Sequence, residues 1–407
     1  MRRSIIIIFV LSSMVVFSQS VGFYYNRGTE RLERKDYENA IIDFKEVLSK
    51  KKDYYEAYND MGKAYMGLNK YTDAIKSFTS AIKLKNDYFS AYLLRSDCYL
   101  KTNKKNSAMK DMASIIKIKP TYIPVYEKRG DMYYTNKNYK KAEADYKKAV
   151  ELNTKRGLTY YNLAEIQHKT DIDAAIINYK KTTVLSPKNS KAFKKLGNIY
   201  YNKKKYNESI SYLGKAVALE DYSKETLKKI ADSYFKLEKY NEAEKAYSKV
   251  LKIYHLRDKE LYSRRGQCYV EQKKYVLAVK DFNKSIAYDR SYVDAYFHRA
   301  YANSKLNKEK LAVRDFTKAL QLNPKCYRAY EKRGKYYFET QKYKLALTDF
   351  NAAIKNNPKP DAKTIYMRGA CYSNISNMKA ACIDLKKASE MGYEPAKKDF
   401  KRNCYGM

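Results

Sequence analysis

The five residues YEKRG occur twice in this chain, at Tyr126–Gly130 and at Tyr330–Gly334, and a near copy, YSRRG, spans Tyr262–Gly266. Measured from the first copy, the other two begin 204 and 136 residues later, and both separations are multiples of 34. A fixed period of this length is typical of repeat arrays, in which one small helical or strand motif is stacked many times. A period of 34 residues arranges nearly the whole chain into eleven repeats.

Small residues recur at two positions in each repeat. The residues at the first small position are Gly28, Gly62, Ser96, Gly130, Ala164, Gly197, Ala231, Gly266, Ala300, Gly334 and Gly369. A second small residue follows twelve residues later, as Ala40 does in the first repeat, except in the fifth repeat, where Ala175 follows after eleven and the turn is predicted to be one residue shorter. Four residues beyond this second small position comes a bulky position, occupied for example by Tyr146. Small residues at matched depths let two antiparallel helices approach closely, and bulky residues fill the space between neighbouring pairs.

This pattern resembles the tetratricopeptide repeat (TPR) family, with Tyr in place of the family's Trp. The resemblance covers residues 21–391. It implies an all-α fold, a right-handed superhelical solenoid of about eleven helix–turn–helix repeats with a concave groove, in which each repeat contacts only its neighbours. Residues 392–407 are expected to form a C-terminal capping helix.

The N-terminal residues 1–20 have the pattern of a secretory signal peptide. Arg2 and Arg3 precede the apolar stretch Ile5–Phe17, and Ser18 and Ser20 have a spacing that suits cleavage. The apolar stretch is shorter than the ~20 residues of a membrane-spanning helix. The sequence therefore predicts export to the periplasm, the cell envelope or the exterior, and it leaves a retained signal anchor open.

The chain carries 83 Lys and Arg against 45 Asp and Glu, a formal net charge of +38. Such an excess has two explanations, the codon usage of an AT-rich genome or an acidic partner. The six cysteines are too sparse for a disulfide framework. Cys98, Cys268 and Cys371 each follow the first small position by two residues, which predicts burial, and Cys371 with Cys382 is the first pair to test for a disulfide.

An Arg directly precedes the first small position in seven repeats, and each of these repeats has an Asp sixteen residues after the Arg. The four other repeats lack both residues. Because positions that vary together are usually in contact, we predict an Arg–Asp bridge between the two helices of each of the seven repeats. A row of Arg lining a phosphate groove is the rival interpretation, but each Arg already has its acid. The predicted bridges are Arg27–Asp43, Arg95–Asp111, Arg129–Asp145, Arg265–Asp281, Arg299–Asp315, Arg333–Asp349 and Arg368–Asp384.

The family resemblance implies that the first helix of each repeat lines the groove. Basic and acidic residues nearly cancel at the positions that should face it, and aromatic residues are frequent there. A near-neutral aromatic groove suits a protein or peptide segment, although some of these rings could instead pack between repeats. The candidate groove residues are Tyr134, Tyr161, Asn198, Tyr201, Phe235, Phe297, Tyr301 and Phe338.

Some family members hold a C-terminal carboxylate with a two-carboxylate clamp. Lys194, Asn198 and Arg264 match parts of that clamp, but Glu260 stands where Lys is expected and would repel the ligand. The sequence therefore argues against this mode of binding.

Catalytic and metal-binding patterns do not occur in the sequence. His168, His255 and His298 are scattered, and there is neither an HExxH motif nor a Gly-rich phosphate loop. We therefore expect no enzymatic activity, no metal and no cofactor.

Two functions follow as hypotheses. The first is an exported scaffold that binds protein or peptide segments in the groove. The alternative is a basic surface adapter whose outer lysines hold anionic polymer, lipid or nucleic acid, with binding that falls steeply as salt rises. Weak contact with anionic envelope components is compatible with the first hypothesis, and no specific nucleic acid is expected of an exported protein.

Overall fold

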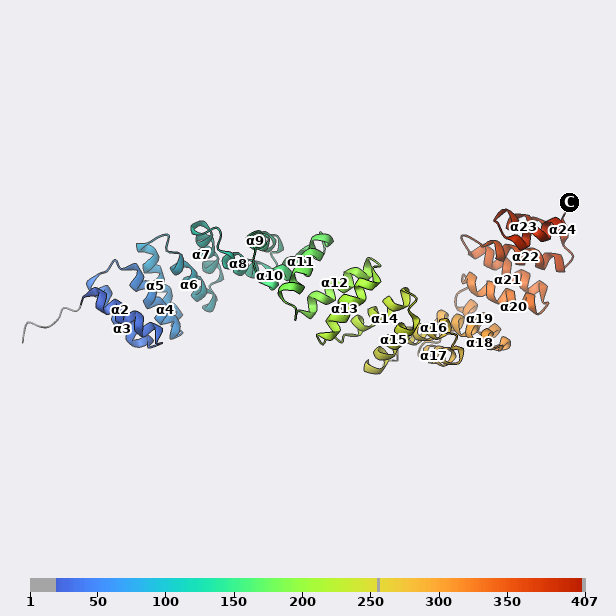
Figure 1. Cartoon of the computed structure of the whole chain (residues 1–407), viewed down its shortest axis with the longest axis horizontal. Helices are drawn as coiled ribbons and strands as arrows, with labels where there is room; N and C mark the ends of the chain where they lie inside the picture. Colours follow the sequence, from blue (N-terminus) through green and yellow to red (C-terminus); the bar gives the residue numbers. More distant parts are fainter. Residues whose placement is uncertain (1–19, 255–256, 405–407) are drawn as a thin grey trace, which may run out of the picture. The chain divides into compact units, whose positions relative to one another are not determined.

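The computed structural model describes residues 20–254 and 257–404. Apart from Ser20, the predicted signal peptide lies outside the described residues. Within them the structure contains 23 α-helices and no strand (Figure 1), so the prediction of an all-α solenoid of TPR helix pairs is confirmed. None of the described helices is long and apolar enough to cross a membrane.

The chain forms two compact bodies that divide between Pro187 and Lys188. We refer to them as the N-terminal body and the C-terminal body. The N-terminal body holds five helix pairs: α2 (Val21–Glu33) with α3 (Tyr37–Lys50), α4 (Tyr55–Gly67) with α5 (Tyr71–Leu84), α6 (Phe89–Lys101) with α7 (Lys105–Ile118), α8 (Ile123–Thr135) with α9 (Tyr139–Glu151), and α10 (Gly157–Gln167) with α11 (Ile172–Leu185).

The C-terminal body holds six further pairs and a final helix. These are α12 (Ser190–Asn202) with α13 (Tyr206–Ala218), α14 (Lys224–Lys236) with α15 (Tyr240–Tyr254), α16 (Lys259–Glu271) with α17 (Tyr275–Tyr288), α18 (Val293–Lys305) with α19 (Glu309–Leu322), α20 (Tyr327–Glu339) with α21 (Tyr343–Asn356), α22 (Ala362–Asn374) with α23 (Met378–Glu390), and α24 (Glu394–Asn403). Each pair is one repeat of the sequence, and we number the repeats 1 to 11 along the chain.

The two small positions lie where the helices of a repeat touch. Every residue at both positions is buried, in all eleven repeats. A Cβ atom placed on Gly62 would lie 2.6 Å from Cε1 of Phe78, and one placed on Gly130 would lie 2.7 Å from Cε1 of Tyr146. A Cβ atom at either position would therefore require the ring at the bulky position of the same repeat to move. Repeats 5, 7 and 9 combine Ala at the first small position with a ring at the bulky position.

The turn between the two helices is tight in ten of the eleven repeats. It has three residues, and the middle one has a positive φ, as Lys35 has at 63°. The fifth repeat differs, because α10 has 11 residues rather than 13 and four residues, 168–171, separate it from α11. The prediction of a shorter turn was wrong: the missing residue is lost from the helix, and the tight turn is replaced by a longer one.

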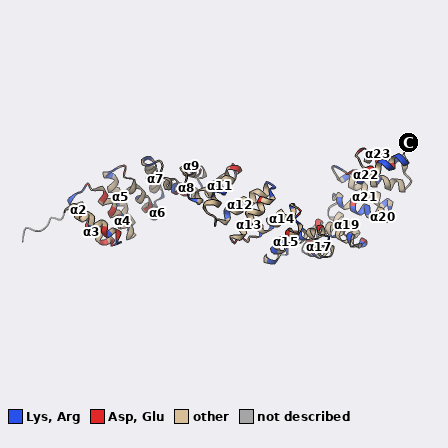
Figure 2. Ribbon diagram, viewed as in Figure 1, with Lys and Arg blue, Asp and Glu red and all other residues tan. Residues whose placement is uncertain are grey.

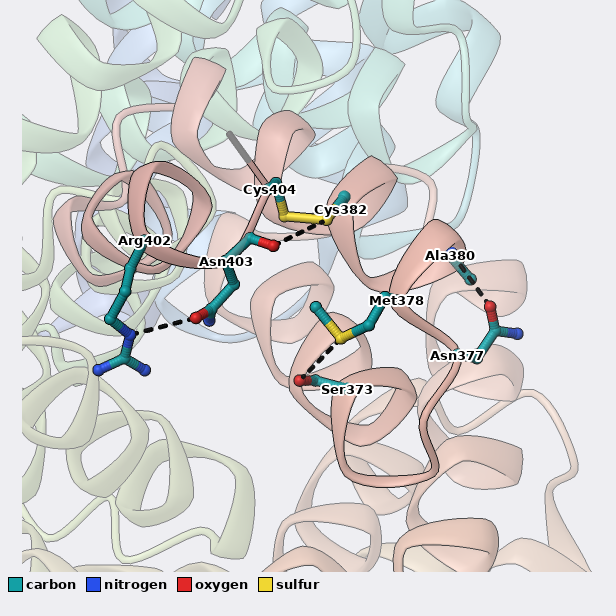
Figure 3. The surroundings of a disulfide bond; sticks show 8 residues. All are labelled: Ser373, Asn377, Met378, Ala380, Cys382, Arg402, Asn403 and Cys404. Atoms are coloured by element: carbon teal, nitrogen blue, oxygen red, sulfur yellow. Dashed lines mark hydrogen bonds between the residues drawn. A yellow bond between two sulfur atoms is a disulfide. The ribbon is translucent and has the colours of Figure 1, made fainter. Parts of the chain in front are cut away.

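The C-terminal helix α24 is fastened to the last repeat. Phe400 packs against Cys382, Leu385 and Cys404, and Cys382 forms a disulfide with Cys404 (Figure 3). The sequence had singled out Cys371 as the first partner to test for Cys382. That choice was wrong, because Cys371 is buried with Ala346 and Phe350 between α21 and α22, whereas Cys382 lies against α24.

Candidate binding groove

The Arg and Asp residues of all seven predicted pairs are in contact. Arg129 donates two hydrogen bonds to Asp145, from Nε at 2.8 Å and from Nη2 at 2.6 Å, and the hydrogen bonds raise the pKa of Arg129 despite its burial. The same two-pronged contact occurs in the other six pairs, and the seven Asp side chains are at most 6% exposed. These Arg residues therefore hold the two helices of a repeat together.

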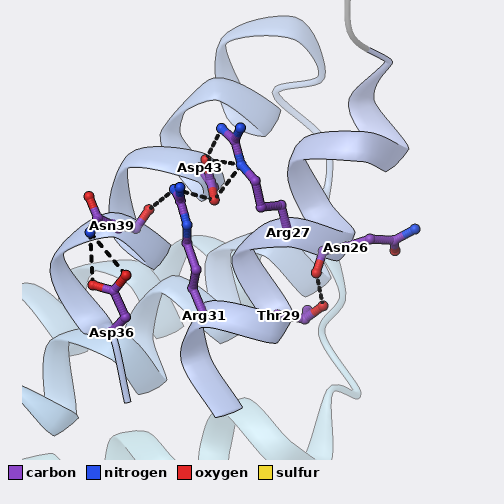
Figure 4. Close-up of polar contacts among 7 residues, drawn as sticks. All are labelled: Asn26, Arg27, Thr29, Arg31, Asp36, Asn39 and Asp43. Carbon is purple, nitrogen blue, oxygen red and sulfur yellow. Dashed lines mark hydrogen bonds and ion pairs between the residues drawn. The ribbon is translucent and has the colours of Figure 1, made fainter. Parts of the chain in front are cut away.

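The first repeat adds a second cation to this arrangement. Arg31 reaches Asp43 at 2.8 Å from the side opposite to Arg27, so that the carboxylate receives two guanidinium groups (Figure 4). Asp43 is fully buried. The first repeat therefore has one ionic contact more than a single Arg–Asp bridge.

The third guanidinium nitrogen crosses to the preceding repeat, which the sequence reasoning missed. Nη1 of Arg333 donates to Thr317 at 2.9 Å. Four other pairs make the same contact: Arg95 with Thr79, Arg265 with Ser248, Arg299 with Asn283 and Arg368 with Asn351. Each of these Arg residues therefore joins three helices.

A signal for this third contact is present in the sequence. The acceptor always follows the bulky position directly, as Thr317 follows Phe316. Before repeats that lack the Arg, the same place holds Lys or Gly: Lys45, Lys147, Lys180 and Gly214. Ala113, which precedes the repeat of Arg129, is the one exception. Comparing each repeat with its neighbour, rather than only with itself, would have found these acceptors.

All eight candidate groove residues are partly exposed, and none is fully buried. Four of them pack edge-on against the first Tyr of the second helix in their own repeat, with ring centroids 5.5–5.9 Å apart. These pairs are Tyr134 with Tyr139, Tyr201 with Tyr206, Phe235 with Tyr240, and Phe338 with Tyr343. Part of each ring is thus used to build the repeat, and part of it stays exposed.

The other candidates divide into packed and polar residues. Tyr161 lies 5.9 Å from Tyr179, and Phe297 lies 5.8 Å from Phe316, measured between ring centroids. Asn198 accepts a hydrogen bond from Lys229 at 3.0 Å. Tyr301 differs from all of these, because its ring is approached by two lysines.

A recess of about 490 Å³ opens between repeats 4 and 5 in the N-terminal body. It joins α8, α9 and α10 and includes the predicted groove residue Tyr134. Its lining combines rings, aliphatic stems and charged groups: Tyr134, Tyr139, Lys140, Glu143, Glu165, Ile166, Lys169 and Thr170. A recess of this size and chemistry can hold one large side chain of a bound segment.

Three carboxylates beside the groove each accept a hydrogen bond from a buried tyrosine at the bulky position of the same repeat. Tyr146 donates to Asp131 at 2.9 Å, and Tyr247 donates to Asp232. The third such pair is Tyr179 with Glu165. Burial, together with the adjacent carboxylate, raises the pKa of each of the three tyrosines, so each remains a hydrogen-bond donor.

This tyrosine–acid pair also has a sequence signal that was missed. Tyr occupies the bulky position only in three repeats, and in those repeats the residue after the first small position is Asp131, Glu165 or Asp232. Repeats with Phe at the bulky position have no acid there. A hydroxyl placed in the core needs a partner, and the acid supplies it.

Cations and acceptors form pairs along the groove face. Lys128 contacts Asp97 of the preceding repeat, and Lys228 contacts Glu260 of the following one at 2.7 Å. Lys194 reaches Asp221 at 3.3 Å and Ser223 at 2.9 Å. Arg264 lies over the ring of Phe235, 5.5 Å from its centroid. The residues that match the two-carboxylate clamp are therefore engaged by other side chains.

The described residues contain no group of three or more His, Cys, Asp and Glu side chains placed to hold a metal ion. Burial raises the pKa of the Cys98, Cys268 and Cys371 thiols to about 12, so they remain protonated at neutral pH.

Comparison with family models agrees with this architecture. Models described as "Tetratricopeptide repeat" match residues 59–123, 124–156, 228–292 and 300–359, which together exceed half of the chain. A model described as "Anaphase-promoting complex, cyclosome, subunit 3" matches residues 168–250. A search of curated protein sequences found no significant match.

Several solved structures are similar in part. A tetratricopeptide repeat protein from Parabacteroides merdae is 23% identical, with a TM-score of 0.45, over 60% of this chain and 97% of that one. YrrB, described as a TPR protein with an unusual peptide-binding site, is 20% identical, with a TM-score of 0.41, over 45% of this chain and 95% of its own. Yeast Tom70 is 15% identical, with a TM-score of 0.36, over 93% of this chain and 99% of its own. From its repeat period, its eleven helix pairs and the family models that it matches, the chain belongs to the tetratricopeptide repeat family.

Proposed function

We propose that this chain is a non-enzymatic, exported scaffold that binds a segment of another protein along the face formed by its first helices. TPR scaffolds generally mediate protein–protein interaction, and this face has the surface that such a role requires. The observation that carries the proposal is the set of partly exposed rings on the first helices within each body, together with the recess beside Tyr134 in the N-terminal body. Aromatic anchors and charges that are already paired favour a peptide over a small polar ligand.

Site-specific photocrosslinking tests the binding face. A benzophenone side chain at Tyr139, which is 48% exposed in the recess, should crosslink a partner in the native cell fraction. The matched control places the same group at Val276, which is 58% exposed on the second helix α17. Ile166→Glu in the Tyr139 protein should abolish the crosslink, because a charge would enter the recess. Equal crosslinking from Val276, or a product that survives Ile166→Glu, would contradict the proposal.

Export is supported by two independent observations. The signal-peptide pattern precedes the array, and the disulfide between Cys382 and Cys404 is a bond that persists in oxidising compartments. Mass spectrometry of the protein purified from its native cells should show a mature chain that begins near Val21 and carries one disulfide. An intact N-terminus with both cysteines alkylated would contradict export, and an intact N-terminus with the disulfide would favour a retained anchor.

Contact of outer lysines with anionic envelope components is a secondary proposal. Lys and Arg lie on helices in both bodies, with Asp and Glu interspersed (Figure 2). Because the chain has 38 more basic than acidic residues, much of this surface is positive. Such contact should weaken steeply with salt, whereas binding through rings should change little.

A further inference from the structure

Tyr301 in repeat 9 is approached by two cations that have no carboxylate partner. The Nζ atoms of Lys305, on α18, and Lys332, on α20, each lie 5.7 Å from the centroid of the Tyr301 ring. Within the described residues neither lysine forms an ion pair. Both side chains are exposed to solvent, and Tyr301 is partly exposed, so the three groups are open to a ligand.

The same places in other repeats are occupied differently. Tyr301 directly follows the first small position, and Lys332 stands two residues before the first small position of the next repeat. Between repeats 3 and 4 these places hold Asp97 and Lys128, which form an ion pair. Between repeats 6 and 7 they hold Asn198 and Lys229, which form a hydrogen bond at 3.0 Å. The acceptor that each lysine meets elsewhere is replaced in repeat 9 by a ring.

The acids near this cluster are engaged elsewhere. Glu331 lies 3.4 Å from the Thr364 hydroxyl, and Asp361 accepts the backbone N–H of Thr364 at 2.7 Å. Glu339 pairs with Lys335 at 3.4 Å.

We propose that Lys305, Tyr301 and Lys332 form a subsite for an acidic peptide segment. This proposal rests on the proposed function and names the chemistry of its ligand. A Glu or Asp carboxylate of the segment would bind between the two ammonium groups, and an adjacent apolar side chain would lie on the Tyr301 ring. An isolated carboxylate suits the site better than a nucleic-acid backbone, because the charge of Glu331 acts on Lys332 and would repel a continuous run of phosphates.

Peptide binding by the full chain tests this subsite. The probe is a short dye-labelled peptide of Glu and Leu, compared with the same peptide carrying Gln in place of Glu, and the readout is fluorescence anisotropy. The double variant Lys305→Gln/Lys332→Gln should weaken binding of the Glu peptide by at least about tenfold, since two charge-assisted contacts are lost. Lys344→Gln/Lys355→Gln removes the same charge from exposed positions on α21 and should leave binding nearly unchanged.

Several results would overturn the subsite. These are equal weakening by the two double variants, equal affinity for the Glu and Gln peptides, or stronger, Lys305- and Lys332-dependent binding of polyuridylate RNA. Failure here is distinguishable from failure of the scaffold proposal, because the Tyr139 crosslink lies in the N-terminal body. A retained Tyr139 crosslink together with no Glu-peptide binding would reject the subsite alone.

Discussion

Repeats 7 and 9 belong to the same body and share one helical frame, yet they place their charges in opposite ways. We call the places of the Arg and Asp in the seven Arg–Asp pairs the bridge positions, and the residue after the first small position the groove position. In repeat 7 the bridge positions hold Ile230 and Ala246. Its groove position holds Asp232, which accepts a hydrogen bond from Tyr247. In repeat 9 the bridge positions hold Arg299 and Asp315, in contact at 2.7 Å, and the groove position holds Tyr301. Repeat 7 therefore has apolar residues at its bridge positions and a hydrogen-bonded acid at its groove position.

The difference indicates that the residues that hold a helix pair together are distinct from those that would contact a ligand. We call this the separation of construction from recognition. The apolar and the ionic bridge positions support the same packing of two helices, since the small positions of both repeats are buried. The residue after the first small position varies together with the bulky position: repeat 7 pairs Asp232 with Tyr247, and repeat 9 combines Tyr301 with Phe316. In repeat 7 burial raises the pKa of Asp232, while Tyr247 and nearby cations counteract the rise, so its charge is offset internally. In repeat 9 the two lysines remain available.

The largest expected effect comes from breaking the bridge of repeat 9 on one side. Arg299→Ala should destabilise α18 and α19 by ~3 kcal/mol, because Asp315 would stay buried without its cation. The double change Arg299→Ile/Asp315→Ala, which copies repeat 7, should cost less than ~1 kcal/mol. Hydrogen exchange of the α19 amides measures both values, with Arg314→Ala as an exposed control on the same helix. A double variant as unstable as Arg299→Ala would show that the two designs are not equivalent.

A smaller effect is expected at the contact that joins neighbouring repeats. Thr317→Val keeps the shape of the side chain and removes the hydroxyl that accepts from Arg333, so it should cost ~1 kcal/mol. Thr348→Val is the matched control, because that hydroxyl bonds only to the carbonyl of Lys344 in its own helix. Urea denaturation compares the two variants, and equal midpoints would argue against the third contact.

A pH-dependent effect is expected at His298, which stands two residues before the first small position of repeat 9. Repeat 9 has His298 where repeat 7 has Lys229, and burial lowers the pKa of His298 to about 4 from its ordinary value of 6.5. The unfolded chain therefore binds a proton more readily, and stability should be lost as the pH falls from 6.5 towards 4. His298→Phe should reduce the fall in melting temperature between pH 7 and pH 4.5. An identical fall in both proteins would exclude this contribution.

Much of the fold could be predicted because it repeats. The buried small positions, the helix pairs and the seven Arg–Asp contacts all recur at fixed spacing, so comparing repeats within one sequence reveals them. The acceptors of Nη1 were missed because Thr317 and its counterparts lie in the preceding repeat and differ in type. Cys404 was missed as the partner of Cys382 because it lies beyond the repeats, where no period constrains it.

The groove was harder to predict than the frame. Spacing indicates which residues lie on the first-helix face, and all eight candidates are partly exposed there. Spacing does not give the direction of each ring, and Tyr134 and Phe338 lean on a tyrosine of their own second helix. The proposed subsite at Tyr301 depends on two lysines from different repeats. Only the three-dimensional structure shows that both approach the same ring.

The separation of construction from recognition is tested most directly at Tyr301. Tyr301→Asp gives repeat 9 the groove acid of repeat 7, and this acid should pair with Lys332 as Asp97 pairs with Lys128. We predict that the variant loses binding of the Glu peptide by at least about tenfold while repeat 9 stays folded, as hydrogen exchange of the α18 amides would show. The control Tyr301→Phe keeps the ring and should keep binding. Undiminished binding by Tyr301→Asp, or a loss of binding accompanied by unfolding of repeat 9, would contradict the account.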